Sequence, residues 1–344
     1  MIQPRPVKSA NVYFTGERRA VVREEYVQPP GPDEVRIRAS CTLISTGTEL
    51  NCYARKWAPG SYFENWVQYP FKPGYSHVGV IEAVGSGVTE LVPGTRVASR
   101  SPHHEYVCCP ATAVISVPDT VNEEDAAWFA IASIVQNGVR AARHVMGESV
   151  VVTGLGILGQ LVVQYARLSG AGEVIAVDLS PFRLDAARRH GATHTIELPV
   201  EKAKPSVTHV TGGHLADTAY DVTGFAPAFT SVLSLARTGG KVVLLGSTGF
   251  PDDQKLASDL ISRGLTVVAA HDSNAPRQAT AHAPWSHRVM QQLFFQYLER
   301  RDLDVHDLIT HRAWASDAAE VYKFLQEDRS EAIGVLFRWR GMGG

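Results

Sequence analysis

A glycine-spaced turn between a predicted strand and a predicted helix constrains the fold of this chain most. Residues 150–153 read Val-Val-Val-Thr, a short apolar strand. They lead into the run Gly-Leu-Gly-Ile-Leu-Gly at residues 154–159, after which apolar side chains recur at helical spacing. In this context Gly154 permits a tight turn, Gly156 lets the backbone approach a pyrophosphate, and Gly159 lets helix and strand pack closely. The free N–H groups at the start of the helix would then face the phosphates of a dinucleotide.

An acidic residue follows the next predicted strand, residues 173–177. Asp178 lies 19 residues after the last glycine of the turn. A carboxylate there accepts hydrogen bonds from a ribose 2′-hydroxyl and repels a 2′-phosphate, so the sequence predicts NAD(H) rather than NADP(H). We assign Ile157 and Leu158 to the same cofactor site. Arg183 is a candidate for the adenosine edge, with a solvated helix residue as the alternative, and a purely structural glycine turn is the alternative for the whole motif.

Strands and helices alternate along this part of the chain. Further strands are predicted at residues 219–222, 241–245 and 265–270. Ser180-Pro181 is typical of a helix start, and a glycine at 191 suits the helix end. Alternation of this kind predicts an α/β fold with a doubly wound parallel sheet covered on both faces. Ligands bind at the carboxyl ends of such strands, which makes Thr223 and Gly246 cofactor candidates, and Asn137 is expected to face the nicotinamide.

The two ends of the chain have a different character. Short strands separated by glycine turns are predicted at residues 34–40, 78–84 and 95–98, a pattern typical of a compact barrel. Helices are predicted at residues 122–144, 285–301 and 315–326, and a last strand at 334–339. We expect residues 1–134 to form a catalytic domain that residues 273–344 complete. Residues 135–272 are expected to form the dinucleotide-binding domain.

Composition excludes several other classes of protein. The 344 residues carry 33 Lys and Arg against 35 Asp and Glu, so no basic field favours nucleic acid or anionic lipid. No apolar run reaches the ~18 residues that span a bilayer, and no apolar leader segment opens the chain. Four cysteines are too few for a disulfide framework and fit a reducing cytoplasm. We therefore expect a cytoplasmic protein whose partner is a small-molecule substrate.

Together these features resemble the medium-chain dehydrogenase/reductase superfamily over nearly the whole chain. The resemblance rests on the 154–159 turn with Asp178, on a Pro-Gly to Gly-Val-Ile stretch over residues 73–85, and on the Pro-Gly-Thr-Arg-Val turn at residues 93–97. It implies a GroES-like β-barrel catalytic domain built from both chain ends, with a Rossmann domain between them. It also implies a homodimer or homotetramer.

The chain departs from this family at its zinc positions. The three positions that hold zinc ligands in the zinc-dependent branch match Thr46, Tyr75 and Ser133, and residues 99–106 run straight through the region of the structural zinc lobe. Catalytic zinc needs three N, S or carboxylate ligands, which neutral hydroxyls do not supply. We therefore expect no functional metal. The motifs resemble a zinc-free branch that includes bacteriochlorophyllide hydroxyethyl dehydrogenase and sugar or cyclitol dehydrogenase-like proteins of secondary metabolism.

Five polar residues are the catalytic candidates, each with a satisfied buried hydrogen bond as its alternative role: Tyr75, Thr48, Glu49, His77 and His103. If their segments are extended, alternate residues share a face, which would place Thr48 with Thr46 and Tyr75 with His77. The resemblance implies that Thr48 is a proton-relay hydroxyl and Glu49 an acid beside the site, and related zinc-free sequences place a histidine at 103. We predict that Tyr75 bonds the reacting oxygen, with its pKa lowered by a charged His77 and a bound NAD⁺.

Residues 53–71 hold seven of the 29 aromatic residues, which suits a sugar ring or a flat polycycle, or else pins a long loop. The function predicted is that of a zinc-independent, NAD(H)-dependent oxidoreductase. It would interconvert a secondary alcohol and a ketone on a sugar, cyclitol or related natural product. A zinc-free quinone or enone reductase and a non-catalytic dinucleotide-binding protein are the alternatives.

Overall fold

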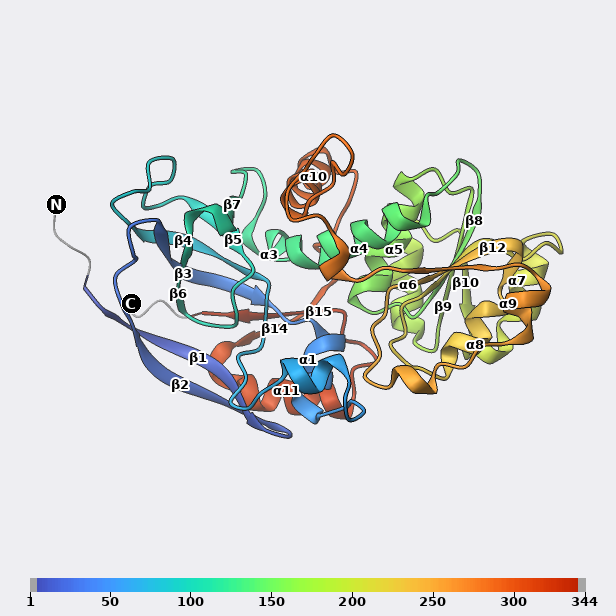
Figure 1. Cartoon of the computed structure of the whole chain (residues 1–344), viewed down its shortest axis with the longest axis horizontal. Helices are drawn as coiled ribbons and strands as arrows, with labels where there is room; N and C mark the ends of the chain where they lie inside the picture. The colour runs from blue at the N-terminus through green and yellow to red at the C-terminus, as the bar shows by residue number, and fades with distance from the viewer. Residues whose placement is uncertain (1–4, 340–344) are drawn as a thin grey trace. The chain divides into compact units, whose positions relative to one another are not determined.

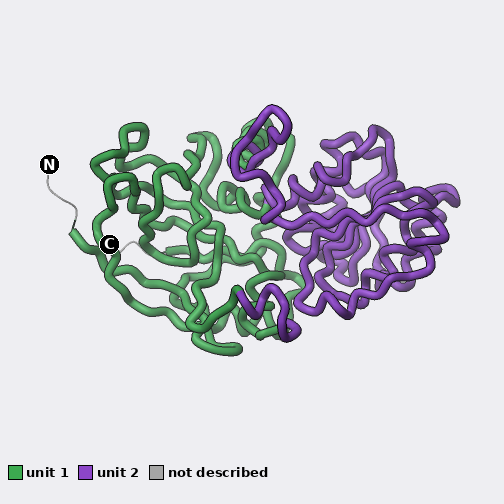
Figure 2. The backbone as a smooth tube through the Cα atoms, viewed as in Figure 1, with its two compact units in different colours: residues 1–56, 66–131, 291–344 green, residues 57–65, 132–290 purple. Residues whose placement is uncertain are grey.

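The computed structural model describes residues 5–339. This part of the chain forms two compact units, drawn in green and purple in Figure 2. Unit 2 comprises Trp57–Asn65 and Ala132–Met290, and unit 1 comprises the rest of the described chain. No helix within residues 5–339 is both long enough and apolar enough to cross a bilayer.

Unit 2 is built on a six-stranded parallel sheet with the strand order β10-β9-β8-β11-β12-β13. The strands are β8 (Ser149–Thr153), β9 (Glu173–Asp178), β10 (His194–Glu197), β11 (Ala216–Asp221), β12 (Ala236–Leu244) and β13 (Thr266–Ala269). Valine and isoleucine side chains of the central strands, such as Val151 and Ile175, are fully buried. Such apolar strands are typical of a sheet covered on both faces, and the predicted doubly wound α/β fold is confirmed.

Helices lie on both faces of this sheet (Figure 1). They are α5 (Ile157–Leu168), α6 (Pro181–Arg189), α7 (Lys204–Val210), α8 (Ala228–Leu233) and α9 (Ser258–Ser262), with α4 (Phe129–Ala142) leading in. Ser180 caps α6 as predicted, because its side chain accepts a hydrogen bond from the backbone N–H of Arg183 at 3.3 Å. Gly191 follows this helix with φ of +108°, a conformation that glycine adopts readily.

Unit 1 contains a seven-stranded sheet and a separate two-stranded ribbon. The main sheet runs β14-β15-β3-β4-β5-β7, with β6 paired to β3, and β1 pairs with β2. The strands are β1 (Val7–Gly16), β2 (Arg19–Val27), β3 (Glu34–Leu43), β4 (His77–Val84), β5 (Arg96–Ser99), β6 (Tyr106–Pro110), β7 (Val114–Ser116), β14 (Ile309–Trp314) and β15 (Gly334–Arg338). Pairing of β15 with β3 brings segments from the two ends of the chain into one sheet, as the family resemblance implied.

The helices of this part of the chain correct two expectations. They are α1 (Thr46–Ala54), α3 (Glu123–Ala126), α10 (His287–Arg300) and α11 (Ala318–Glu327), and the short α2 (Tyr62–Trp66) lies at a unit boundary. The segment with Thr46 and Thr48 is helix α1 and not extended, so these two side chains do not share a face. The single helix expected over residues 122–144 is divided into α3 and α4.

The unit boundaries differ from the domain boundaries expected at residues 134 and 272. Unit 2 begins at Ala132, extends to Met290 and includes Trp57–Asn65. The reason lies in specific contacts, because the Ala58 N–H donates to the Gly249 carbonyl at 2.8 Å and Gln136 Nε2 donates to the Met290 carbonyl at 2.7 Å. These contacts join residues that are far apart in the sequence, so local composition does not reveal the unit boundaries.

The glycine turn before α5 generates a stability prediction. A Cβ on Gly159 would come within 2.0 Å of the Gly154 carbonyl oxygen, whereas a Cβ on Gly156 would meet nothing within 4 Å. We expect Gly159→Ala to lower the free energy of unfolding by about 1–3 kcal/mol, because overpacking displaces backbone. Urea unfolding measures the loss. Gly156→Ser is the matched control, and an equal loss in both variants would contradict the close packing of α5 on β8.

Candidate active site

The glycine turn of unit 2 leaves room for a pyrophosphate. Gly154 has φ of +86°, and its Cβ position lies 3.1 Å from the backbone of Thr223, so only glycine fits there without strain. Gly156 is the N-cap residue of α5, and the space beside it is open. An N-terminal helix turn with free N–H groups and an open approach fits the pyrophosphate of a dinucleotide.

Asp178 is held beside this turn by backbone N–H groups. Its Oδ2 accepts from the Leu155 N–H at 2.6 Å, and its Oδ1 accepts from the Ser180 N–H at 2.9 Å. Each carboxylate oxygen has two lone pairs, so both keep acceptor capacity for a ligand hydroxyl. The carboxylate that the sequence placed near the turn is therefore fixed in position beside it.

The other cofactor candidates near the turn differ in exposure. Ile157 is buried and Leu158 is half-buried, so the backbone of this first helical turn is the part that can face phosphates. Arg183 lies on α6 half-buried, and its carbonyl accepts from Gln160 Nε2 at 2.9 Å. That contact ties α5 to α6.

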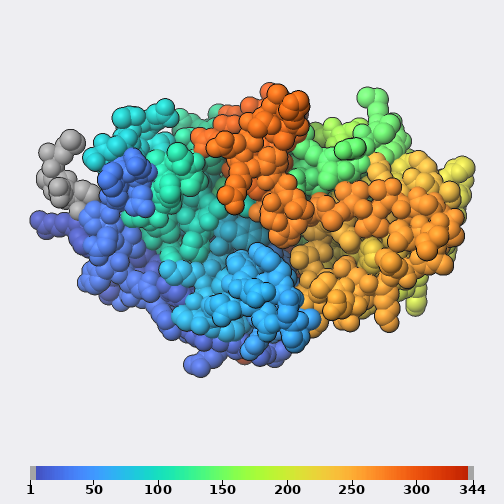
Figure 3. Space-filling view, viewed as in Figure 1, coloured from blue at the N-terminus to red at the C-terminus, as the bar shows by residue number. Residues whose placement is uncertain are grey.

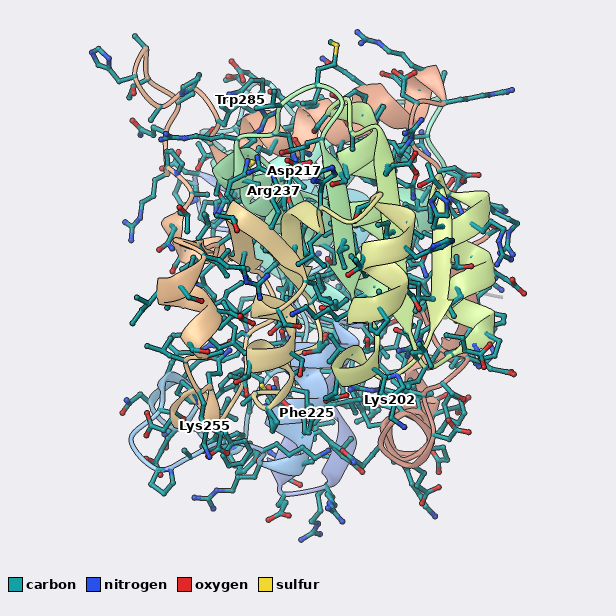
Figure 4. The ribbon with its side chains drawn as sticks, turned by 90° about the vertical axis from the view of Figure 1, so that its right-hand side faces the viewer. Lys202, Asp217, Phe225, Arg237, Lys255 and Trp285 are labelled. Atoms are coloured by element: carbon teal, nitrogen blue, oxygen red, sulfur yellow. The ribbon has the colours of Figure 1, made fainter. Side chains whose placement is uncertain are left out.

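Several candidate residues lie at the carboxyl ends of the unit 2 strands. Thr223 follows β11, where its N–H and hydroxyl both bond Asp221 Oδ1, at 3.1 and 2.7 Å. Burial raises the pKa of Asp221. In Figure 4, Phe225 lies beyond this end of β11, while Asp217 and Arg237 lie at the opposite end of the sheet, joined by an ion pair of 2.6 Å. Gly246 follows β12, and a Cβ there would lie 2.8 Å from the Gly224 nitrogen.

Asn137 belongs to the same end of unit 2. Its Nδ2 donates to the carbonyl of His271 at 3.0 Å, so α4 is fastened to the segment after β13. The imidazole of His271 contacts the ring of Tyr62 edge-on at a centroid distance of 5.9 Å. Tyr62 lies in the aromatic stretch of residues 53–71, and its contact with a residue more than 200 positions away gave no local signal.

The buried carboxylate of Glu49 is the centre of a hydrogen-bonded cluster in unit 1. Its Oε1 accepts from the Ser45 N–H at 2.8 Å. Its Oε2 accepts from the Tyr322 hydroxyl at 2.5 Å and bonds His103 Nε2 at 3.0 Å. Both Glu49 and His103 are at least 98% buried. This carboxylate therefore has three protein donors and joins α1, α11 and the segment before β6.

Both ring nitrogens of His103 have hydrogen-bond partners. Its Nδ1 bonds Thr42 Oγ1 at 2.8 Å, and that oxygen also accepts from Trp339 Nε1 at 3.3 Å. Its Nε2 bonds Glu49 Oε2 at 3.0 Å. The side chains of Glu49 and His103 are thus fully occupied within the protein, which favours a positioning role for both.

The hydroxyl groups of Tyr75, Ser45 and Thr48 lie together beside this cluster. The Tyr75 hydroxyl donates to Ser45 Oγ at 2.6 Å. Burial raises the pKa of Tyr75 to about 12, and the nearby charge of Glu49 raises it further, while the hydrogen bonds that join Tyr75 to Ser45 and Thr48 lower it. The phenol therefore keeps its proton at neutral pH. Sequence reasoning named Tyr75 and Thr48 as candidates but not Ser45, although Ser45 begins the Ser-Thr-Gly-Thr-Glu segment that contains Thr48.

His77 does not act as the charged neighbour that the sequence interpretation required. Burial lowers its pKa to about 4, so the imidazole is neutral at physiological pH. Its Nε2 bonds the His104 carbonyl at 3.1 Å, away from the Tyr75 hydroxyl contact. The expected lowering of the Tyr75 pKa by a cationic His77 is therefore wrong, because an uncharged ring supplies no such field.

The residues of the described chain do not fit a catalytic zinc ion. Within residues 5–339, no three His, Cys, Asp or Glu side chains form a group that could hold a metal. The family ligand positions carry the hydroxyls of Thr46, Tyr75 and Ser133. In unit 1, the side chains of Glu49 and His103 are bonded to each other and to neighbouring side chains.

Two protein-family models match parts of this chain. A model described as "Alcohol dehydrogenase GroES-like domain" matches residues 31–119, and one described as "Zinc-binding dehydrogenase" matches residues 158–282. The L-threonine 3-dehydrogenase of Rhizobium etli (strain CIAT 652) is 27% identical over 339 residues, covering 88% of this chain and 91% of that protein. The sorbitol dehydrogenase of Bacillus subtilis (strain 168) is 28% identical over 276 residues, covering 71% and 76%.

Solved structures share the fold. An Escherichia coli oxidoreductase/dehydrogenase of unknown specificity superposes with a TM-score of 0.83 at 18% identity, covering 97% of this chain and 100% of that chain. The galactitol-1-phosphate dehydrogenase of Escherichia coli has a TM-score of 0.78 at 20% identity, with 96% and 99% covered. The chain belongs to the medium-chain dehydrogenase/reductase superfamily. Within it, the chain is an NAD(P)-dependent oxidoreductase of the alcohol and polyol dehydrogenase family.

Two buried neutral histidines make the stability of this unit sensitive to acid. Burial lowers the pKa of His77 to about 4 and that of His104 to about 3, whereas an unfolded histidine titrates at ~6.5. Because the unfolded state binds more protons below ~6.5, stability is complete above that pH and is lost as pH falls toward 4. Each histidine contributes a slope of up to ~1.4 kcal/mol per pH unit.

Urea unfolding from about pH 7 to about pH 5 measures this slope. We expect His104→Gln to make the loss of stability with acid shallower. His209→Gln is the control, because His209 is exposed on α7. A wild-type slope in the His104→Gln variant would contradict the buried neutral state.

Proposed function

We propose that this enzyme interconverts a secondary alcohol and a ketone on a sugar, cyclitol or related small molecule, using NAD(H) and no zinc. The observation that carries the proposal is the donor set of unit 1. Hydroxyl groups stand at the family's ligand positions, and the carboxylate and imidazole nearby are saturated by protein partners. Without a Lewis acid, charge on the reacting oxygen must be handled by hydrogen-bond donors and proton transfer.

The fixed carboxylate of Asp178 supports the choice of NAD(H). It lies beside the glycine turn and is anchored by two backbone N–H groups, so it cannot swing away from a 2′-phosphate without losing both bonds. The backbone of residues 154–159 would hold the pyrophosphate, and Thr223, Gly246 and Asn137 are the candidates for the nicotinamide end. When bound, the nicotinamide supplies hydride exchange with the carbinol carbon.

Tyr75 is our candidate for the donor to the substrate oxygen. Because its pKa is raised to about 12, the phenol is a proton donor at neutral pH, which suits ketone reduction. In the present structure the Tyr75 hydroxyl donates a hydrogen bond to Ser45 Oγ, and Thr48 supplies a further hydroxyl. These neighbours form a path along which a proton can pass. Glu49 and His103 position the backbone of Ser45.

The aromatic stretch gives partial support for a ring-shaped substrate. Tyr53 packs on Phe14 and Tyr322 in the core of unit 1, so it is structural. Tyr62, by contrast, is 59% exposed, and residues near 60 form part of the surface in Figure 3, coloured light blue. Relatives named sorbitol and galactitol-1-phosphate dehydrogenase support a polyol-like substrate class. A homodimer or homotetramer stays a prediction, supported by the partly exposed edge strand β13 with Val267 at 37%.

Cofactor selectivity tests the role of Asp178. We expect NADH to bind at least about tenfold more tightly than NADPH, because the carboxylate bonds the ribose hydroxyls and repels a 2′-phosphate. Asp178→Asn should reduce the ratio between the NADPH and NADH dissociation constants. Asp185→Asn is the matched control, since Asp185 is an exposed acid on α6 paired with Arg188. Equal dissociation constants for both cofactors in the unmutated enzyme would overturn the assignment.

The zinc content of the purified protein tests the proposed zinc independence. We expect purified protein grown with added zinc to contain well under one zinc per chain, because the donor set lacks three suitable ligands. Chelators should leave turnover unchanged. Elemental analysis and steady-state kinetics measure both. Stoichiometric zinc that is lost together with activity would refute zinc independence.

Removal of one hydroxyl tests the proton donor. We expect Tyr75→Phe to reduce kcat by ~10²-fold or more and to leave NADH affinity nearly unchanged. Tyr13→Phe is the matched control, because the Tyr13 hydroxyl likewise donates to a side-chain oxygen, that of Glu25, at 2.8 Å. Near-normal turnover of Tyr75→Phe would make Tyr75 a packing residue. Binding of NADH without turnover of any alcohol or ketone would favour a non-catalytic protein.

A further inference from the structure

The buried side chain of Gln160 holds the glycine turn of unit 2 from the inside. Gln160 is the fourth residue of α5, and its side chain is fully buried. Its Nε2 donates to the Leu155 carbonyl at 3.1 Å and to the Arg183 carbonyl at 2.9 Å. One amide group on α5 therefore joins the glycine turn to helix α6.

These two bonds close a ring of hydrogen bonds around the turn. The Leu155 N–H donates to Asp178 Oδ2 at 2.6 Å, and the Ser180 N–H donates to Asp178 Oδ1 at 2.9 Å. Ser180 Oγ accepts from the Arg183 N–H at 3.3 Å, and the Arg183 carbonyl accepts from Gln160. Because both ends of the ring meet at Leu155, this peptide is fixed relative to α6 and to the Asp178 carboxylate.

The bond to the Leu155 carbonyl also sets the direction of the next N–H group. A trans peptide is planar, so the Leu155 carbonyl and the Gly156 N–H project to opposite sides of the peptide bond. The carbonyl points to the buried amide of Gln160, and the Gly156 N–H therefore points away from it. A Cβ on Gly156 would meet nothing within 4 Å, so the space beside this residue is open.

The Gly156 N–H is one of the donors that a pyrophosphate at this turn would use. Gly156 is the N-cap residue of α5, and the first bond of the helix runs from the Gln160 N–H to the Gly156 carbonyl at 3.1 Å. The N–H groups before this bond have no partner within the helix. A hydrogen bond accepted by a peptide carbonyl also polarises the N–H of the same peptide and makes it a stronger donor. Gln160 thus affects both the direction and the strength of this donor.

A second glutamine of unit 2 has the same hydrogen-bonding pattern away from the turn. Gln136 Nε2 donates to the Met290 carbonyl at 2.7 Å and to the Tyr165 hydroxyl at 3.2 Å. In both glutamines, Oε1 is buried and has no hydrogen-bond partner within residues 5–339. The two side chains therefore differ in what their donors hold, and Gln136 is a matched control for the loss of a buried amide.

We propose that Gln160 is a positioning residue for the pyrophosphate of the bound dinucleotide. It holds the Leu155–Gly156 peptide so that the Gly156 N–H donates to a phosphate oxygen, and it keeps this peptide in register with Asp178. This role rests on the proposed placement of the pyrophosphate at residues 154–159. It is independent of zinc and of the proton donor, because the turn and its ring of hydrogen bonds lie entirely in unit 2.

ADP binding tests this role, because ADP carries the pyrophosphate and lacks the nicotinamide. Gln160→Met keeps the length of the side chain and removes both donors, so we expect about tenfold weaker ADP binding by isothermal titration of the full-length protein. Gln136→Met should leave ADP affinity unchanged. Urea unfolding confirms that both variants are folded. Unchanged ADP affinity in Gln160→Met, or an equal loss in both variants, would contradict the positioning role.

NMR observes the Leu155–Gly156 peptide directly. Leucine labelled with ¹³C at the carbonyl and glycine labelled with ¹⁵N together select Leu-Gly pairs, of which the sequence has three: Leu155-Gly156, Leu158-Gly159 and Leu245-Gly246. The signal that is lost in Gly156→Ser identifies Gly156. We expect ADP to shift the Gly156 amide proton downfield in the unmutated protein, because a charge-assisted hydrogen bond forms. Gln160→Met should reduce this shift, and Gln136→Met should preserve it.

The outcomes separate the role of Gln160 from the placement of the cofactor. An ADP-induced Gly156 shift that is the same in Gln160→Met as in the unmutated protein would overturn the positioning role and leave the placement intact. The measurement on the unmutated protein does not depend on the folding of any variant. ADP that binds without moving the Gly156 signal, or no saturable ADP binding at millimolar concentration, would overturn both the placement and the role.

Discussion

The carboxylate of Glu49 is the contact on which the catalytic half of this enzyme depends. It accepts hydrogen bonds from the backbone of Ser45, from the hydroxyl of Tyr322 and from the imidazole of His103. A carboxylate this deeply buried is tolerable only because three donors replace its water. The same bonds that stabilise the charge fasten helix α1, and this helix sets where Ser45 and Thr48 present their hydroxyls to Tyr75. In the proposed function, the carboxylate and the imidazole therefore hold the scaffold, and the hydroxyl groups carry the proton transfer.

The nucleotide half depends on a comparable constraint, expressed in backbone geometry. Gly159 has no space for a side chain against Gly154, so the first turn of α5 packs directly on the end of β8. Asp178 then bridges the turn and the next strand end through two backbone N–H groups. The glycine turn and Asp178 thus form one connected piece of chain, and the proposed phosphate and ribose contacts both lie on it.

The contrast between local backbone motifs and contacts of distant side chains also explains what could be predicted from the sequence. The unit 2 strands and the Ser180 cap were predictable because valine runs and capping residues are local signals. Helix α1 was not, because Thr-Gly-Thr is a poor helix former and the helix is secured by the Glu49 carboxylate on Ser45. Tyr322, whose hydroxyl bonds Glu49 from 273 positions away, could not be found by any local pattern. The assumed charge of His77 failed for a related reason, since burial is decided by the complete fold.

The most direct test of zinc-independent hydride transfer follows the hydrogen atom itself. Metal-stripped enzyme is incubated with NADH deuterated at C4 of the nicotinamide and with ketones derived from polyols, and the alcohol products are analysed by mass spectrometry. The account predicts transfer of one deuterium to the carbinol carbon, at the same rate with and without a chelator. Transfer that occurs only after zinc is restored would contradict it.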